Sequence, residues 1–292
     1  MNQLPQLLVS GILTGVVYGL VAVGYSLVYS VLGLVNFAHG AIVAIGAYTT
    51  VIFMGNWGWS LAPTTVVVVL FGVVVGLTIE RFAYRPVRAG GQVQSLITAL
   101  GAYVVIENII ALVFGSDAQN LPANMAASVV ELPLGVRVTT VQIATLIAGL
   151  AIMGGVQMMI DRAAVGRRLR AVADDPARAA TAGVDVEGVL RVAFGVGSGL
   201  GALAGMFVAL DTGCNPYMGG IIGFKAFAAC AVARSVSVRS AMLVALGIGV
   251  GESMIVGYLS SEYRNAIVLG VLTVLMLVGG GAATWEGRAR EA

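Results

Sequence analysis

The sequence predicts an all-α polytopic membrane protein with about 8–10 transmembrane helices and with interrupted helices in both halves. The chain has 292 residues, of which 59% are hydrophobic and only 10% are charged, whereas soluble domains carry about 25% charged residues. Its apolar runs reach roughly 20 residues, the length at which a helix spans a bilayer. Segments of about ten residues with alternating polarity, which are typical of membrane β-barrels, do not stand out.

Nine apolar segments are expected to form one transmembrane domain. They cover residues 6–30, 34–54, 61–80, 93–115, 138–160, 189–210, 217–233, 240–259 and 265–281. If all nine cross the membrane in alternation, every loop Lys and Arg except Arg137 and Arg264 falls on one side. Basic loops mark the cytoplasmic side, so we expect the N-terminus outside and the C-terminus inside. A re-entrant pair in place of one segment would move the N-terminus.

The longest external connection covers residues 116–137 and contains Pro122 and Pro133. A connection of this length is often functional. We therefore expect it to cap the outer mouth of the bundle and to provide a contact surface.

Polar residues interrupt two of the apolar segments. The stretch 34-LVNFAHGAIVAIGAYTT-50 contains Asn36, the single histidine His39 and Gly40, and 213-GCNPYMGG-220 repeats this character with Asn215 and Pro216. Such residues favour broken helices, whose freed backbone groups need polar partners. Interrupted segments in both halves are typical of a central pathway, so we predict that 36-NFAHG-40 lines or props open a translocation path. A buried core role for His39 is the alternative.

Ionisable side chains inside membrane spans are costly to bury and are candidate functional residues. An ion pair between Lys225 and either Glu252 or Glu107 would lower that cost. Such a pair can contact a substrate or hold the helices together, and the sequence leaves both roles open. The predicted translocation pathway consists of Asn36, His39, Glu107, Asn215, Lys225 and Glu252.

A hydrophilic loop at about residues 161–188 contains a short capped helix. Asp175 can cap it, Pro176 suits its first position and Gly183 can end it. A helix of about two turns is marginal alone and needs a surface to lie against. That surface is either the protein's own span ends or a cytoplasmic partner, and an ordinary solvated connector is the third interpretation.

Four stretches of the chain resemble the LivH/LivM family of ABC-importer permeases. They are 32-LGLVNFAHGA-41 preceded by 18-YGLVAVGYSLVYSV-31, then 79-IERFAYRPVR-88, 166-GRRLRAVADDPARAATAGVDV-186 and 215-NPYMGGIIGFKAFAACAV-232. They occur in the family's order and cover almost the whole chain. The similarity is greater to LivH-like members, because the amino-terminal pattern begins at once.

The resemblance implies one permease domain over residues 1–292 in the bacterial inner membrane, forming the path for branched-chain or related amino acids. It implies a heterodimer with a second, LivM-like permease, two ATP-binding subunits and a periplasmic or lipid-anchored substrate-binding protein. Membrane lipid surrounds such a protein, and no nucleic acid partner is expected. The family's coupling contact with the ATPase falls on Asp174, Asp175, Pro176, Arg178, Ala179 and Gly183.

The chain itself is expected to be no enzyme and to bind no cofactor or metal. Its only lysine, Lys225, lacks the preceding glycine of a Walker A motif, so ATP and Mg²⁺ are expected on partner subunits. Cys214 and Cys230 lack metal-ligand spacing. Close relatives carry urea or short-chain amides, so these or another small organic solute are alternative substrates. A stand-alone channel, a secondary transporter and a non-transporting scaffold are alternative functions.

Three features depart from the family pattern. Arg234 and Arg239 occupy positions in 231-AVARSVSVRSA-241 where glycines are expected, and the chain ends with 279-GGGAATWEGRAREA-292. Both lie on the expected cytoplasmic side and concern the identity of the neighbouring subunits. Glu107 replaces a glutamine that is common in the family, and a carboxylate there is expected to alter substrate preference.

Overall fold

The computed structural model describes residues 3–34, 36–121, 128–132, 135–233, 238–259 and 261–274. In this part of the chain seven helices are long and apolar enough to cross a membrane, and the helices Met218–Val232 and Arg264–Val274 are shorter and apolar. Each of the nine predicted segments therefore corresponds to one apolar helix, the last being described as far as residue 274. The predicted fold class is confirmed.

The first half of the chain contains four long helices. They are α1 (Leu4–Leu32), α2 (Ala38–Thr50), α3 (Leu61–Ile79) and α4 (Gln92–Phe114). Wider π-helical turns extend α2 and α3 at Val51–Asn56 and Glu80–Tyr84, and a 3-10 turn at Arg88–Gly90 precedes α4. The extension lengthens α2 from 13 to 19 residues, which a bilayer crossing requires, whereas α3 has 19 residues without its extension.

The second half begins with a short antiparallel hairpin and continues with helices. The elements are β1 (Val129–Leu132), β2 (Val136–Thr139), α5 (Thr140–Arg162), α6 (Ala164–Asp174), α7 (Pro176–Thr181), α8 (Val186–Thr212), α9 (Met218–Val232) and α10 (Val238–Tyr258). The hairpin is a structured part of the connection 116–137 that the sequence analysis did not foresee. Pro122 and Pro133 lie outside the described residues.

The centre of the bundle is formed by α1, α2 and α8, which bury most of their side chains, whereas α3, α4, α5 and α10 bury only a minority of theirs. The core contacts repeat between the two halves, because α1 packs along α10 while α8 packs along α3 and α2. A helix that is apolar but exposed needs lipid or another apolar surface around it. The outer helices are therefore the ones available to membrane lipid and to partner subunits.

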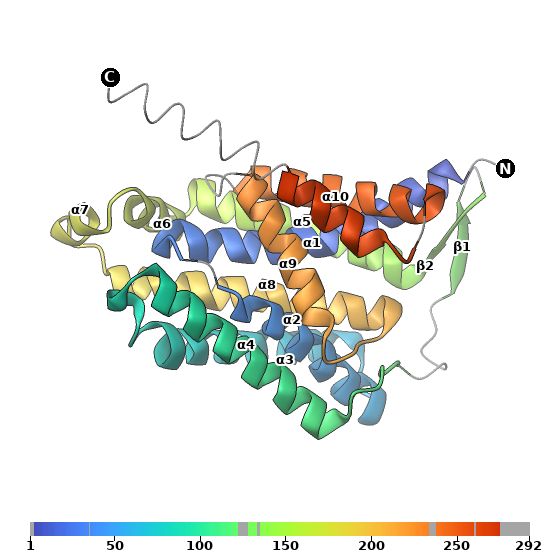
Figure 1. Cartoon of the computed structure of the whole chain (residues 1–292), viewed down its shortest axis with the longest axis horizontal. Coiled ribbons are helices and arrows are strands. Elements are labelled where there is room, and N and C mark those ends of the chain that lie inside the picture. The colour runs from blue at the N-terminus through green and yellow to red at the C-terminus, as the bar shows by residue number, and fades with distance from the viewer. Residues whose placement is uncertain are drawn as a thin grey trace, which may run out of the picture.

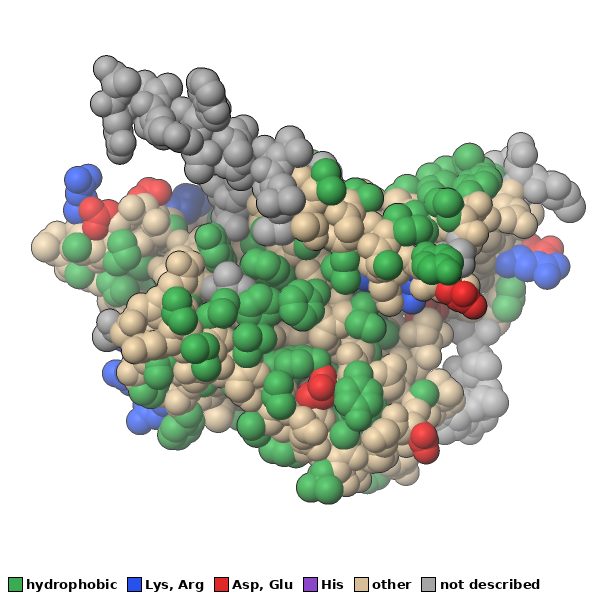
Figure 2. All heavy atoms as spheres, viewed as in Figure 1, with side chains coloured by type: hydrophobic (Ala, Val, Ile, Leu, Met, Phe, Trp, Pro, Cys, Tyr) green, Lys and Arg blue, Asp and Glu red, His purple; other side chains and the backbone are tan. Residues whose placement is uncertain are grey.

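The two ends of the bundle differ in their polar decoration. In Figure 1, the start of α1 and the β1–β2 hairpin lie at one end of the long axis, and α6 and α7 project from the other. The side chain of Gln6 donates to the Arg137 carbonyl at 3.0 Å and accepts from the Arg137 amide at 2.8 Å, which fixes the hairpin to α1. Figure 2 shows Lys and Arg side chains gathered at the α6–α7 end and hydrophobic side chains over most of the middle.

Ion pairs tie together connections that the topology prediction assigns to the same side. Arg88 pairs with Glu187 at the start of α8, with Arg85 at 3.9 Å from the same carboxylate, and Arg239 pairs with Asp161 at the end of α5. An N-terminus outside the cell stays a prediction. Three of its supporting residues, Arg234, Arg288 and Arg290, lie outside the described residues.

Candidate functional site

Two helix breaks with the same local design organise the centre of the bundle. Gly33 ends α1 with φ 64° and Gly213 follows α8 with φ 78°, a conformation that glycine adopts without steric penalty. After each glycine an asparagine carbonyl accepts the amide of the residue three positions on. Asn36 accepts from His39 at 3.1 Å, and Asn215 accepts from Met218 at 3.3 Å. The chain thus restarts as α2 and as α9 within the protein.

The first turns of α2 and α9 lie against each other. A Cβ atom added to Gly40 would lie 2.5 Å from the carbonyl oxygen of Gly219, and one on Gly219 would collide with the carbonyl of Gly40. Only glycine permits backbones to approach this closely. The two breaks therefore meet at a glycine contact in the core.

Asn36 and His39 lie on the packed side of this contact. The Tyr84 hydroxyl donates to Asn36 Oδ1 at 3.0 Å. His39 is 1% exposed, and its ring lies 4.7 Å from that of Tyr25 and directly against Gly24 of α1. Neither ring nitrogen makes a hydrogen bond of good geometry with a described residue, although the Val21 backbone of α1 lies close to the ring. The surroundings of His39 are those of a core side chain, and the residue does not line the charged cavity described next.

An ion pair is buried on the other side of the contact. Lys225 Nζ of α9 lies 2.7 Å from Glu252 Oε1 of α10, and the two side chains are 1% and 5% exposed. The Tyr18 hydroxyl of α1 donates to Glu252 Oε2 at 2.9 Å and accepts from Lys225 Nζ at 3.2 Å. Arg264 Nε lies 3.2 Å from the same Glu252 Oε1. Of the two partners that the sequence analysis offered Lys225, the structure selects Glu252.

This hydrogen-bonded arrangement explains how the charges are tolerated. Removing an ammonium and a carboxylate from water costs several kcal/mol for each ion, and their attraction offsets this only with good geometry and further hydrogen bonds. Glu252 receives donors from Lys225, Tyr18 and Arg264, so both carboxylate oxygens are satisfied. The cluster joins α1, α9, α10 and the helix Arg264–Val274 at one point.

The cluster lines a cavity of about 490 Å³. Its wall comes from the first half of α1, the start of α5, the end of α8, and from α9, α10 and Arg264. These segments belong to the half of the bundle that carries the hairpin, the expected outer side (Figure 1). Asn215 lines the same cavity. A cavity of this size with a few convergent polar groups has the properties of a small-molecule site.

Glu107 lies apart from this cavity. Its carboxylate accepts a hydrogen bond from the Tyr103 hydroxyl one turn earlier on α4, and it is partly exposed on that helix. The structure thus brings Asn215, Lys225 and Glu252 together and places Asn36 and His39 together elsewhere. Glu107 lies outside both groups, on α4 with Tyr103.

The predicted capped helix is present as α7. The Asp175 side chain accepts from the amides of Ala177 and Arg178 at 2.9 and 3.0 Å, and Pro176 occupies the first position. At the other end Gly183 has φ 81°, and the Val184 amide donates to the Ala179 carbonyl at 3.0 Å. The Gly183 amide also donates to the Ala180 carbonyl at 3.0 Å, and the two bonds together form a Schellman motif.

One face of α7 rests on the protein and the rest is exposed. Ala179 is 5% exposed, whereas the Arg178 side chain is 90% exposed and pairs with Asp175 at 3.0 Å. Asp174 is the last residue of α6. Ala179 therefore contacts the chain's own helices. Among the predicted coupling residues, Ala179 packs α7 against the protein, while Arg178 is accessible to a partner.

Comparisons with known proteins agree with this architecture. The family described as branched-chain amino acid transport system, permease component, matches residues 7–277. The high-affinity branched-chain amino acid transport system permease protein LivH of Escherichia coli (strain K12) is 32% identical over 285 residues, covering 94% of this chain and 92% of that protein. The chain belongs to this permease family. Its function as a permease component of a transport system, rather than as an enzyme, follows from that membership.

Other relatives extend the comparison. The permease protein BraD of Pseudomonas aeruginosa, named as part of a high-affinity branched-chain amino acid transport system, is 30% identical over 284 residues, covering 93% of this chain and 92% of that protein. Among solved structures, a chain of PsaBC from Streptococcus pneumoniae in complex with Fab is similar with a TM-score of 0.53 at 14% identity, covering 92% and 89% of the two chains. At this identity the likeness concerns the fold. The permease is thus a multi-pass membrane protein that works with partner subunits.

Two residues of the charged cluster were missed by the sequence analysis. Tyr18 lies in an apolar run and shows no local signal, since its partner Glu252 is 234 positions away. Arg264 was assigned to the outer side as a loop cation and not as a partner of Glu252. Among the described residues no group of three or more His, Cys, Asp or Glu side chains could hold a metal ion.

Proposed function

We propose that this permease imports a branched-chain or related aliphatic amino acid across the bacterial inner membrane, driven by two separate ATP-binding subunits. A periplasmic or lipid-anchored binding protein delivers the substrate, and a second, LivM-like permease completes the pathway. ATP and Mg²⁺ bind to the ATPase subunits. Support comes from the family membership and from the relatives named for branched-chain amino acid transport.

The observation that carries the proposal is the charged cavity around Lys225 and Glu252. A zwitterion that crosses a membrane needs polar partners, because an unpaired charge in hydrocarbon costs several kcal/mol. Asn215, Lys225 and Glu252 provide such partners inside the bundle. We assign these three residues to the pathway. Asn36, His39 and Glu107 remain proposed as residues that border it, the first two through the glycine contact that they share with α9.

Transport by the assembled system tests the proposal. Membrane vesicles that contain the permease and its partner subunits should accumulate radiolabelled L-leucine only when ATP and the binding protein are present. Urea and acetamide should not compete with leucine. Uptake by the chain alone without ATP would identify a channel or secondary transporter. Transport that urea or acetamide inhibits and amino acids do not would show that the substrate is a small amide and not an amino acid.

The capped helix α7 is proposed as the contact with the ATPase. Arg178→Glu reverses an exposed charge on α7 while leaving both helix caps in place. We expect ATP hydrolysis to continue while leucine uptake falls by about fivefold or more, as for coupling free energies of about 1–3 kcal/mol. Arg137→Glu, an exposed arginine at the opposite end, is the matched control. Normal uptake in Arg178→Glu would exclude α7 as the coupling contact.

A further inference from the structure

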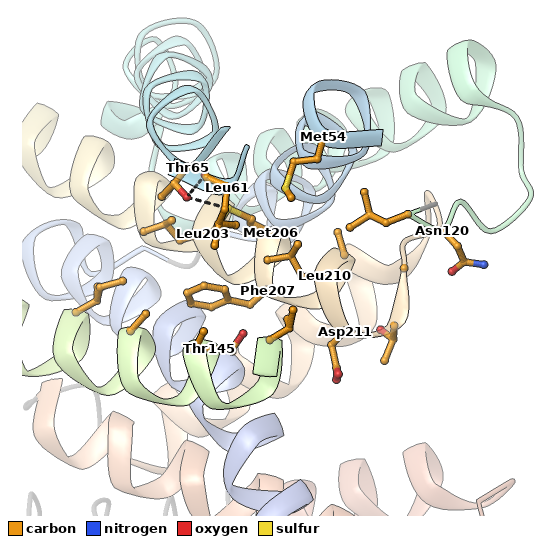
Figure 3. Close-up of a pocket in the computed structure, with 18 residues that line it drawn as sticks. Met54, Leu61, Thr65, Asn120, Thr145, Leu203, Met206, Phe207, Leu210 and Asp211 are labelled. Carbon is orange, nitrogen blue, oxygen red and sulfur yellow. Dashed lines mark hydrogen bonds between the residues drawn. The ribbon is translucent and has the colours of Figure 1, made fainter. Parts of the chain in front are cut away.

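A second cavity lies beside the charged one. Its volume is about 550 Å³, and its wall is mostly aliphatic. Leu203, Met206 and Leu210 of α8 line it together with Met54 and Leu61, and Figure 3 shows Leu61 and Thr65 beside Met206. Thr65 donates to the Met206 sulfur at 3.6 Å, so this hydroxyl has a partner. The cavity therefore suits an apolar group.

The two cavities share part of their wall. Thr145, Phe207, Asp211 and Thr212 line both. The Phe207 ring is only 6% exposed and in Figure 3 extends from α8 toward Thr145 of α5. Phe207 and Thr145 thus form the partition between an aliphatic compartment and a charged compartment.

The charges in the pair of cavities are distributed unevenly. Lys225 and Arg264 both contact one oxygen of Glu252, so the α9–α10 wall has two cations for one carboxylate. Asp211 lies on the α8 wall, where the two cavities join. Among the described residues, the Asp211 carboxylate accepts one hydrogen bond, from Gln142 Nε2 at 2.9 Å. An excess of positive charge therefore faces a carboxylate that has remaining acceptor capacity.

We propose that the two cavities form a single site for a zwitterionic amino acid with an aliphatic side chain. Lys225 and Arg264 hold the carboxylate, Asp211 holds the ammonium group, and the compartment beyond Phe207 receives the side chain. This assignment rests on the proposed function and gives it a structural basis for selectivity. A neutral ligand such as urea would gain no charge-assisted contact from the two cations or from the remaining acceptor capacity of Asp211, which disfavours its binding relative to a zwitterion.

The charge assignment is tested with a ligand that lacks the ammonium charge. Binding of radiolabelled L-leucine to the purified, assembled transporter is measured in competition with 4-methylvalerate, which has no ammonium group. Asp211→Asn should weaken leucine binding by about tenfold, the loss of one charge-assisted contact, and should leave 4-methylvalerate unaffected. Asp117→Asn, an exposed acid in the loop after α4, is the matched control and should change neither ligand.

The side-chain assignment is tested by filling the aliphatic compartment. Ala148 of α5 lines it, whereas the neighbouring Ile147 is 64% exposed and points away. Ala148→Phe should reduce the affinity for leucine by about tenfold or more and change that for alanine by less than about twofold. Ile147→Phe adds an aromatic ring to the same helix and should alter neither affinity.

A second variant keeps the test decisive if Ala148→Phe does not assemble. Leu210→Ala enlarges the same compartment and should raise the affinity for phenylalanine relative to leucine. Three results would each overturn the inference. Ala148→Phe could lower the affinities for leucine and alanine equally, or it could release bound lipid without weakening leucine binding. Leu210→Ala could leave the preference for leucine over phenylalanine unchanged. Failure of the wild-type system to take up leucine would instead overturn the proposed function.

Discussion

The break between α1 and α2 and the break between α8 and α9 begin alike but end in different surroundings. Each has a glycine with positive φ and an asparagine carbonyl that starts the next helix. The ionisable side chain that follows the first break, His39, is enclosed by Tyr25 and by glycine backbone. After the second, Lys225 reaches an ion pair and a cavity. The local sequence determines where a helix restarts, and the neighbouring helices determine whether its polar residue is packed among apolar atoms or paired beside a cavity.

Glycine distribution accounts for part of this difference. Around His39 the facing positions are Gly24 and Gly201, whose hydrogen atoms leave room for the imidazole ring and for little else. Around Lys225 the facing residues are Tyr18 and Glu252, whose polar atoms reach the ammonium group. Close backbone packing excludes water, whereas larger polar side chains hold a space open. The comparison predicts that substitutions near the first break act through side-chain size, and that substitutions near the second break act through charge.

The largest effect is expected from Lys225→Met. It leaves Glu252 buried with its main cation removed, and breaking a buried pair in this way costs about 3–5 kcal/mol. We expect leucine uptake to fall to background and thermal stability of the purified protein to drop. Lys225→Met combined with Glu252→Gln removes both charges and should recover stability but not uptake. Recovery of uptake in the double variant would reduce the pair to a structural role.

Next in size is His39→Ala, which deletes a large buried side chain. Such deletions cost about 2–5 kcal/mol because the surroundings collapse only in part. His39→Leu keeps similar bulk without the ring nitrogens and should stay within about 1.5 kcal/mol of the wild type. Thermal unfolding and leucine uptake should then change together in both variants. A His39→Leu protein that is stable but inactive would place the imidazole in the pathway.

A smaller effect is expected from Gly40→Ala at the contact between the breaks. The added methyl group would lie 2.5 Å from the Gly219 carbonyl, and overpacking of this kind costs about 1–3 kcal/mol. Gly251→Ala is the control, since a Cβ atom there meets nothing within 4 Å. The control should keep or slightly raise thermal stability. Equal behaviour of the two variants would show that α2 and α9 separate without cost.

Several of these features could be predicted from the sequence because their signals are local. Span length located the helices, and Asp175, Pro176 and Gly183 defined α7 through residues within nine positions of one another. The choice of Glu252 over Glu107 as partner of Lys225 could not be predicted. Helices such as α1 are apolar on every face, so their periodicity does not say which side meets which neighbour.

For the same reason, the surroundings of His39 and Ala179 could not be predicted from the local sequence. The sequence shows that a polar residue follows a break and that a small residue lies in a capped helix. Whether His39 faces a cavity depends on Gly24 and Gly201 of other helices, and the burial of Ala179 depends on how α7 folds back on α6 and α8. Both contacts join segments whose pairing the local sequence pattern does not indicate.

The smallest effect is expected from Arg264→Gln, which sharpens the contrast within the charged cluster itself. The Arg264 side chain is 46% exposed, so water screens its attraction to Glu252, and exposed pairs contribute about 0–1 kcal/mol. Glu252 would still accept from Lys225 and Tyr18. Thermal stability should therefore stay within about 1 kcal/mol of the wild type. Leucine binding should weaken by about two- to fivefold, equivalent to about 0.4–1 kcal/mol. The reason is that the carboxylate of leucine loses one of its two proposed partners, Arg264, and keeps Lys225. Arg137→Gln at the same end of the bundle is the control for a general loss of positive charge and should leave leucine binding unchanged. A collapse of stability as large as that of Lys225→Met would show that Glu252 depends equally on its exposed and its buried cation.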